Sequence, residues 1–168
     1  MGDNYAEVII KKRTDALATF FRIFTIIVTV AVVYATILYF QAVGPVVIAL
    51  FIYLDYIVFK NTDVEFEYFF INGQLDVECI YGKKKRKPAK SFNFDKLEVM
   101  APKSNQKILA YEHRTDIKDF NYTSCYEDRD VYVAILVGKD GKLGRLYFEP
   151  SENMIKAIST HCPNKVYK

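Results

Sequence analysis

The 168-residue sequence predicts a transmembrane α-helical hairpin followed by a small α+β domain. We expect this domain to be an antiparallel β-sandwich or barrel of about seven strands, capped by a C-terminal helix. Three observations lead to this prediction. No charged residue occurs between Arg22 and Asp55, the chain from Asp63 onward alternates apolar and charged residues, and an amphipathic segment closes the sequence. The bulk composition, 51% hydrophobic and 26% charged, is ordinary, so the distribution of residues carries the prediction.

The first apolar run, Ile23–Val43, is long enough for one membrane crossing. At about 1.5 Å per residue it forms a helix of about 31 Å, and the hydrocarbon core of a bilayer is about 30 Å thick. Gly44-Pro45 then predicts a turn and a new helix start. A second apolar run, Val46–Phe59, follows. We therefore expect transmembrane helices at about residues 19–42 and 45–60.

Basic residues flank this hairpin on one side only. Lys60 follows the second run, four basic residues precede the first run, and the connecting turn carries neither Lys nor Arg. The positive-inside tendency then places both termini in the cytoplasm, with residues 1–18 as a cytoplasmic N-terminal tail of a multi-pass protein of the cell membrane. Arg22 and Lys60 are the predicted membrane-interface anchors, because long basic side chains can reach the headgroups.

Several alternatives remain for the apolar runs. They could be a cleaved signal peptide, a buried helix pair of a soluble protein, or a re-entrant hairpin that enters the bilayer without crossing it. The second run also contains Asp55, which is either a functional carboxylate or a residue at headgroup level near Lys60, and we favour the latter. The apolar cluster Val8-Ile9-Ile10 either lies on the membrane surface or adds an edge strand to the domain.

The domain, residues 61–168, begins with a predicted hairpin. Apolar and charged residues alternate from Val64 to Phe70 and again from Leu75 to Tyr81, a period typical of strands with one buried face. Asn72-Gly73 between them is a strong signal for a tight hairpin turn. These two segments should therefore pair antiparallel.

The remaining strands are predicted from shorter patterns. A second hairpin should join Val131–Val137 to Lys142–Phe148 through the turn Gly138-Lys139-Asp140-Gly141. The weaker strand candidates are Ala89–Phe94, Leu97–Ala101, Ile108–His113 and Asp119–Thr123.

A helix should close the chain after Pro150-Ser151. Ser151 is a favourable N-cap, and Glu152 suits the positive end of the helix dipole. Apolar residues from Met154 to Ile158 share one helix face, and Pro163 ends the helix.

This order of elements resembles the membrane-anchored bacterial pleckstrin-homology-like (PH-like) proteins, an uncharacterised family. The opening hairpin Glu67–Leu75, the basic run with Phe92–Val99, and the final helix after Phe148-Glu149-Pro150 carry the resemblance. It extends over about residues 20–162. The resemblance implies a pair of transmembrane helices directly before a PH-like domain, an antiparallel bent sheet capped by a helix, and it implies little about activity.

Residues 82–90 read GKKKRKPAK and form the predicted lipid-binding loop. Its basic residues, called here the basic segment, are Lys83, Lys84, Lys85, Arg86, Lys87 and Lys90. Because the hairpin should return the chain toward the bilayer, we expect this loop at the membrane-proximal end of the domain. General electrostatic docking onto anionic lipids, a topology signal alone, and recognition of a specific headgroup remain open. The net charge of +3 does not support nucleic acid as a partner.

No residue pattern supports catalysis, a metal or a cofactor. The two histidines, His113 and His161, are far apart, and the three cysteines show no paired spacing and are read as reduced thiols. Ser124-Cys125 has no neighbouring histidine to activate it. The acidic run Glu127–Asp130 lacks the ligand order of a calcium loop and is interpreted as a solvated loop.

The predicted function is therefore a non-enzymatic, membrane-anchored interaction module at the cytoplasmic face. Its expected partners are the lipid bilayer, anionic lipids and a membrane protein or a second copy of the chain. The alternative is a structural subunit of a homo-oligomeric or mixed membrane complex, which would pack through small residues of the hairpin. A membrane enzyme would depend on Asp55 and the acidic run alone.

Overall fold

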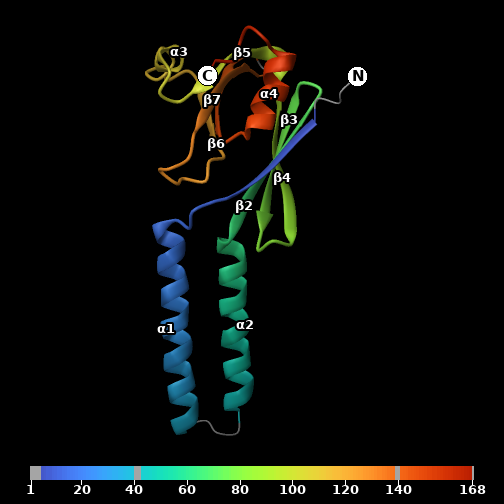
Figure 1. The fold of residues 1–168 in the computed structure, drawn as a ribbon. Coiled ribbons are helices and arrows are strands. Elements are labelled where there is room, and N and C mark those ends of the chain that lie inside the picture. Colours follow the sequence, from blue (N-terminus) through green and yellow to red (C-terminus); the bar gives the residue numbers. More distant parts are fainter. Residues whose placement is uncertain (1–4, 40–42, 139–140, 168) are drawn as a thin grey trace. The chain divides into compact units, whose positions relative to one another are not determined.

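The computed structural model describes residues 5–39, 43–138 and 141–167 (Figure 1). The chain divides into two compact units. The first, called here the helical unit, comprises Arg13–Val64 and Tyr81–Lys85. The second, the sheet unit, comprises Met1–Lys12, Glu65–Ile80 and Arg86–Lys168.

The helical unit contains α1 (Ala16–Tyr39) and α2 (Gly44–Thr62), which run side by side (Figure 1). Both helices are long and apolar enough to cross a membrane, and their apolar side chains are mostly exposed. The predicted helices therefore exist, although α1 begins earlier and α2 ends later than expected. Gly44 allows a close approach, since an added Cβ would lie 3.3 Å from the Cβ of Thr36. Residues 40–42, which lie between the two helices, are outside the described residues.

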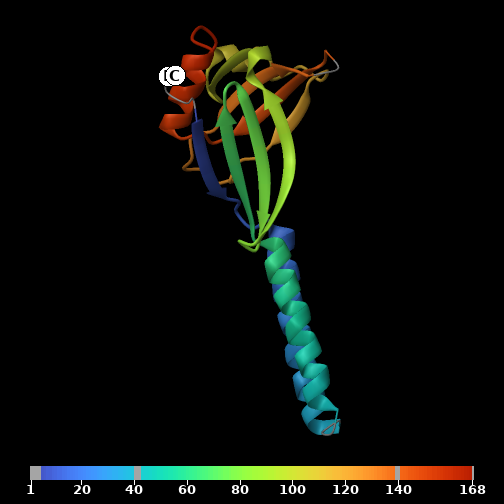
Figure 2. The ribbon, with the colours of Figure 1, turned by 90° about the vertical axis from the view of Figure 1, so that its right-hand side faces the viewer.

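Sheet A contains β1 (Tyr5–Lys11), β2 (Val64–Ile71), β3 (Gln74–Tyr81) and β4 (Lys85–Asn93), hydrogen-bonded in that order (Figure 2). β1 pairs antiparallel with β2, with Tyr5 opposite Ile71 and Lys11 opposite Glu65. The apolar cluster near the N-terminus therefore forms an edge strand, one of the two alternatives that the sequence left open. The predicted tail thus contributes a strand to the domain.

The turn between β2 and β3 has the predicted hairpin geometry. Asn72 and Gly73 have φ angles of 47° and 87°, and positive φ at both central residues is the hallmark of a type I′ turn. A side chain at position 73 would also collide with the end of the last helix, because an added Cβ would lie 2.3 Å from Nε2 of His161.

Sheet B has the order β5-β7-β8-β6. Its strands are β5 (Leu97–Pro102), β6 (Lys118–Asn121), β7 (Tyr132–Val137) and β8 (Leu143–Phe148). β7 pairs antiparallel with β5 and β8, whereas β6 runs parallel to β8. The described residues thus form eight strands in two sheets, where the sequence predicted about seven. The second predicted hairpin is confirmed, while Lys139 and Asp140 of its turn lie outside the described residues.

The predicted strand Ile108–His113 is wrong. This segment contains the short helix α3 (Gln106–Leu109) followed by turns. The side chain of Asn105 caps α3 by accepting a hydrogen bond of 3.0 Å from the backbone N–H of Lys107. The cap favours a helical turn over an extended chain. A 3₁₀ turn (Phe94–Lys96) also separates β4 from β5.

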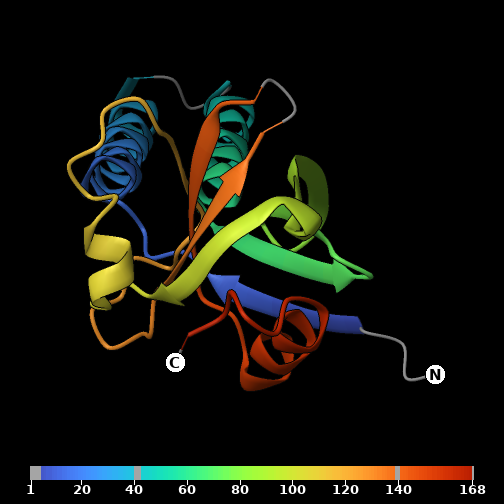
Figure 3. The ribbon, with the colours of Figure 1, turned by 90° about the horizontal axis from the view of Figure 1, so that it is seen from above.

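The main core is aromatic and is closed by α4 (Glu152–His161), as predicted. Tyr68 of β2 and Phe94 both pack edge-to-face against Phe148 of β8. Met154 and Ile158 of α4 are fully buried, and the helix lies beside β1 (Figure 3). Ser151 caps α4 through a hydrogen bond from the backbone N–H of Met154.

Sheet B is also covered on its other face. Leu146 and Phe148 of β8 belong to the main core, so Arg145 and Tyr147 point to the opposite side because strand side chains alternate. A second apolar cluster lies there and includes Ile108 of α3. Its other buried members are Val99, Ala101, Val133 and Ile135. This second layer positions the pocket described below.

Candidate functional site

The basic segment is a turn followed by an edge strand. Lys83 and Lys84 lie in the turn, and β4 begins at Lys85, so the predicted loop is wrong beyond Lys84. All six basic side chains are exposed. Pro88, which has no N–H to donate, and a row of lysines are both typical of an edge strand.

The turn is attached to the end of α2 within the helical unit. The backbone N–H of Gly82 donates a hydrogen bond of 2.8 Å to the carbonyl of Asp63. Gly82 has a φ of 55°, and an added Cβ would lie 2.4 Å from Cγ of Lys60. Glycine is therefore needed here for both its backbone conformation and its small size. As a result, Lys83 and Lys84 begin directly beside the last turn of α2.

The two predicted anchors lie at this same end of the helical unit. Nε of Arg22 donates a hydrogen bond of 2.6 Å to Oγ1 of Thr62, and its guanidinium group stacks 5.1 Å from the centre of the Phe59 ring. Lys60 lies over the ring of Tyr56. We call the resulting group the basic collar. Its members are Arg22, Lys60, Lys83, Lys84 and Lys85.

Arg86 is held by the sheet unit. Its guanidinium group forms an ion pair of 2.9 Å with Glu67, whose side chain is completely buried. Burial raises the pKa of Glu67, and the nearby carboxylates of Glu7 and Glu78 raise it further, whereas Arg86 lowers it. Arg86 thus compensates the buried charge of Glu67, a role that sets it apart from the neighbouring lysines of the basic segment.

Lys90 contacts a different part of the sheet unit. Its Nζ lies 3.7 Å from the centre of the Phe120 ring, and Nζ of Lys118 lies 5.5 Å from the same ring. Phe120 in turn packs edge-to-face against Phe92 of β4. Lys90 therefore belongs to the junction between β4 and β6. The six predicted residues of the basic segment consequently divide among separate environments.

Asp55 is turned toward α1. Oγ1 of Thr29 donates a hydrogen bond of 2.8 Å to Oδ2 of Asp55, so the carboxylate joins the two helices. Within the described residues, Oδ1 is buried and has no hydrogen-bond partner. The position of Asp55 at headgroup level stays a prediction.

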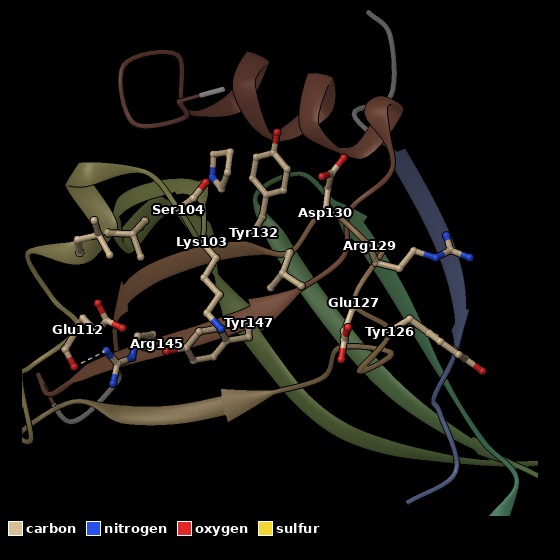
Figure 4. Close-up of a pocket in the computed structure, with 14 residues that line it drawn as sticks. Lys103, Ser104, Glu112, Tyr126, Glu127, Arg129, Asp130, Tyr132, Arg145 and Tyr147 are labelled. Atoms are coloured by element: carbon tan, nitrogen blue, oxygen red, sulfur yellow. Dashed lines mark hydrogen bonds between the residues drawn. The ribbon is translucent and has the colours of Figure 1, made fainter.

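The sheet unit also contains a pocket of about 730 Å³ that sequence analysis missed (Figure 4). It lies on the outer face of sheet B, between α3 with the turns that follow it and the 126–132 segment. Three tyrosines contribute to its lining: Tyr126, Tyr132 and Tyr147. Its charged lining residues are Lys103, Arg129, Arg145, Glu112, Glu127 and Asp130.

Arg145 holds one wall of this pocket. The residue is only 7% exposed, and its Nε and Nη2 donate hydrogen bonds of 2.7 and 3.1 Å to the carboxylate of Asp119. Nη1 donates a hydrogen bond of 2.9 Å to the carbonyl of Tyr111 and one of 3.3 Å to that of Glu112. The bond to Asp119 raises the pKa of Arg145, so the guanidinium group stays charged. It thereby ties the turns after α3 to the sheet.

Glu149 lies outside the lining and holds the chain just before the 126–132 segment. It is 6% exposed, and its Oε1 accepts hydrogen bonds of 2.7 Å from both the backbone N–H and the hydroxyl of Ser124. Ser124 directly precedes the segment that carries Tyr126 and Glu127. At the other end of that segment, the backbone N–H of Lys103 donates a hydrogen bond of 2.9 Å to the carbonyl of Val131.

Two sequence signals could have indicated this pocket. Arg145 is a single charged residue within the otherwise apolar strand 143–148, and such a residue is rarely buried without a partner. The acidic run Glu127–Asp130, interpreted as a solvated loop, supplies two of the lining carboxylates. In the described part of the chain, no three His, Cys, Asp or Glu side chains lie close enough together to hold a metal ion.

Comparison with known proteins gives one match. A family model described as bacterial PH-like domain matches residues 2–168. No curated protein and no solved structure matches the chain. The matched range includes β1 and both apolar helices together with the rest of the domain, so the family pattern extends over both units.

Proposed function

The chain belongs to the bacterial PH-like domain family, and on that premise we propose that it is a membrane-anchored, non-enzymatic interaction module. Helices α1 and α2 anchor it in the cell membrane, and the basic collar docks onto anionic lipid headgroups. Both chain termini lie on the cytoplasmic side. PH-like domains are generally interaction modules without catalytic activity.

The hydrogen bond between Gly82 and Asp63 carries this proposal. It attaches the basic turn to the end of α2 at 2.8 Å, so Lys83 and Lys84 share one end of the hairpin with Lys60. Two apolar helices that carry a group of cations at one end fit a bilayer whose surface is anionic. Each such cation near an anionic leaflet contributes about 1 kcal/mol.

The pairing of β1 with β2 supports a hairpin that begins and ends on one side of the membrane. These strands flank the helices in the sequence, and they pair from Tyr5–Ile71 to Lys11–Glu65. A hydrogen-bonded sheet cannot extend through a bilayer with its polar backbone edges unsatisfied. The chain must therefore return to the side from which it entered, either by two crossings or by a re-entrant loop.

Lysine footprinting of the full chain in lipid nanodiscs tests the docking. Acetylation rates of Lys83, Lys84 and Lys85 are measured by mass spectrometry in phosphatidylglycerol and in phosphatidylcholine discs. We expect protection of at least fivefold that appears only in phosphatidylglycerol and is lost in high salt, because screening shortens the range of the attraction. Lys156, exposed on α4, is the internal control. Equal rates in both lipids would reduce the collar to a topology signal and refute the docking.

A structural subunit of a membrane complex is the second candidate function. The exposed apolar faces of α1 and α2 favour it, since another helix could cover them as well as lipid does. The mass of the detergent-solubilised protein distinguishes the two. A stable oligomer at dilute concentration supports the subunit, and a monomer supports the independent module.

A further inference from the structure

We propose that the pocket on the outer face of sheet B holds a polypeptide segment of a partner protein through a lysine or arginine side chain of that segment. This inference rests on the proposal that the chain is an interaction module, and it names the kind of side chain that the module would bind. It does not require the basic collar to contact lipid.

The walls of the pocket are built with buried charges. Three charged residues are buried in the described part of the chain, and two of them, Arg145 and Glu149, hold the chain around the pocket. Burying a charged group is costly unless its hydrogen bonds are satisfied. A fixed cavity loses little entropy when a ligand enters it, which favours binding. The hydrogen bonds of Arg145 and of Oε1 of Glu149 hold the chain on two sides of the pocket, while Oε2 of Glu149 has no hydrogen-bond partner among the described residues.

The charges left to meet a ligand are mainly negative. The positive charge of Arg145 is already paired with Asp119 at 2.7 Å. Within the described residues, no side-chain hydrogen bond or ion pair involves any of the other charged lining residues. Three of these residues are negative, Glu112, Glu127 and Asp130, and two are positive, Lys103 and Arg129. Figure 4 shows the side chains of Arg129 and Asp130 pointing away from Lys103 and Tyr147, with Glu112 and Glu127 on either side of Lys103 in this view. Two carboxylates and one ammonium group are therefore left beside Tyr147.

The tyrosines favour a cation in the same place. Tyr147 and Tyr132 are partly buried, and burial raises the pKa of both phenols, so their rings stay neutral. A guanidinium or ammonium group gains both from a carboxylate and from the face of an aromatic ring. Tyr147 already shows this preference, because the guanidinium group of Arg145 lies 5.7 Å from the centre of its ring.

The size of the pocket favours a polypeptide over a small cation. A volume of about 730 Å³ lies within the range of whole ligands, about 300–1,000 Å³, and greatly exceeds one side chain. Apolar residues line the part of the pocket beside α3, among them Pro102, Ile108 and Leu109. One cationic side chain would meet the carboxylates, and the neighbouring residues of its segment would cover this apolar part.

Selection from a random dodecapeptide library tests the proposal. The library is displayed on phage and selected on the full chain in phosphatidylcholine nanodiscs, after depletion on the Glu127→Gln/Asp130→Asn variant. Enriched peptides are synthesised, and their Kd values are measured by fluorescence polarisation. We expect the peptides to share a lysine or arginine, and we expect Glu127→Gln to raise Kd at least tenfold. Asp128→Asn is the matched control, because it removes the same charge from a neighbouring exposed residue outside the pocket lining, and it should change Kd less than twofold.

Several results would overturn the proposal. These are enrichment of acidic peptides, equal effects of Glu127→Gln and Asp128→Asn, failure to enrich any peptide, or a free argininamide that binds as tightly as the peptides. The variant Lys83→Gln/Lys84→Gln/Lys85→Gln separates this test from that of the proposed function. It should abolish lipid-dependent protection and leave the peptide Kd unchanged, so either site can fail without the other.

Discussion

The basic collar and the pocket both gather charged side chains, but they do so in opposite ways. The three lysines of the collar that follow Gly82 are consecutive in the chain and exposed. The pocket collects residues from distant segments, and the chain around it is held by Arg145 and Glu149, each less than a tenth exposed. The collar therefore suits a diffuse, fluid partner such as a lipid surface. The pocket suits a ligand of defined shape.

The difference in burial also determines how strongly a substitution in each region affects stability. An exposed cation interacts through water, so its contribution is small and depends on salt. A buried charged group that makes several hydrogen bonds, such as the guanidinium group of Arg145, is costly to replace because these bonds are lost together. Substitutions in the pocket walls should therefore affect folding, whereas substitutions in the collar should affect only the contact with a partner.

Arg145→Met should have the largest effect. It removes the hydrogen bonds from Arg145 to Asp119 and to the carbonyls of Tyr111 and Glu112. Because the Asp119 side chain is 52% exposed and stays hydrated, we expect the free energy of unfolding to fall by about 2 kcal/mol. Thermal unfolding of the full chain in detergent measures the change. Arg114→Met is the matched control, because Arg114 makes the same two-bond contact with Asp116 on the surface. Equal Tm values for both variants would contradict the assigned role of burial.

Gly82→Ala should have the second largest effect on stability. We expect the free energy of unfolding to fall by about 1 kcal/mol because of the positive φ, and further because the new Cβ would clash with Lys60. The control is Gly141→Ala, since Gly141 has a φ of 74° and no atom within 4 Å of an added Cβ. The difference in Tm between the two variants isolates the contact between the basic turn and α2. If Gly141→Ala is equally destabilising, that contact is not important for stability.

Glu67→Gln should alter the pH dependence of stability. The pKa of Glu67 is raised in the folded state above its ordinary value of 4.5, so keeping the carboxylate charged costs stability at neutral pH. Stability should increase as the pH falls through the raised pKa toward 4.5. The variant should lack this increase in a series of thermal unfolding curves. An unchanged pH profile would mean that Arg86 compensates the buried charge completely.

The smallest effect on stability is expected for Lys83→Gln/Lys84→Gln/Lys85→Gln. These side chains are exposed, and surface substitutions usually change stability by less than about 0.5 kcal/mol. Its Tm in detergent should therefore match that of the wild type, while protection by anionic lipid disappears. A large drop in Tm would assign the collar a structural role.

The elements that sequence analysis predicted are those encoded by neighbouring residues. The β2–β3 hairpin depends on Asn72-Gly73, and α4 depends on Ser151 and the apolar face that follows it. The basic segment could be predicted from the sequence because its residues are also neighbours in the chain. Local patterns could not indicate that Arg145 pairs with Asp119, or that the chain near Tyr5 pairs with the chain near Ile71. The strand predicted at Ile108–His113 failed because capping by Asn105 favours a helical turn there.

The place of β1 in sheet A has a consequence for biosynthesis. Its partner β2 is separated from it by the whole of α1 and α2, about 50 residues, which a ribosome adds in roughly 3–10 s at about 5–20 residues per second. During that time Ala6 and Ile10, both buried in the finished sheet, have no strand to cover them. Both helices are therefore synthesised between β1 and its partner, and sheet A cannot begin to close around β1 until α2 is complete. We expect β1 to stay accessible to a protease added during synthesis until β2 has emerged.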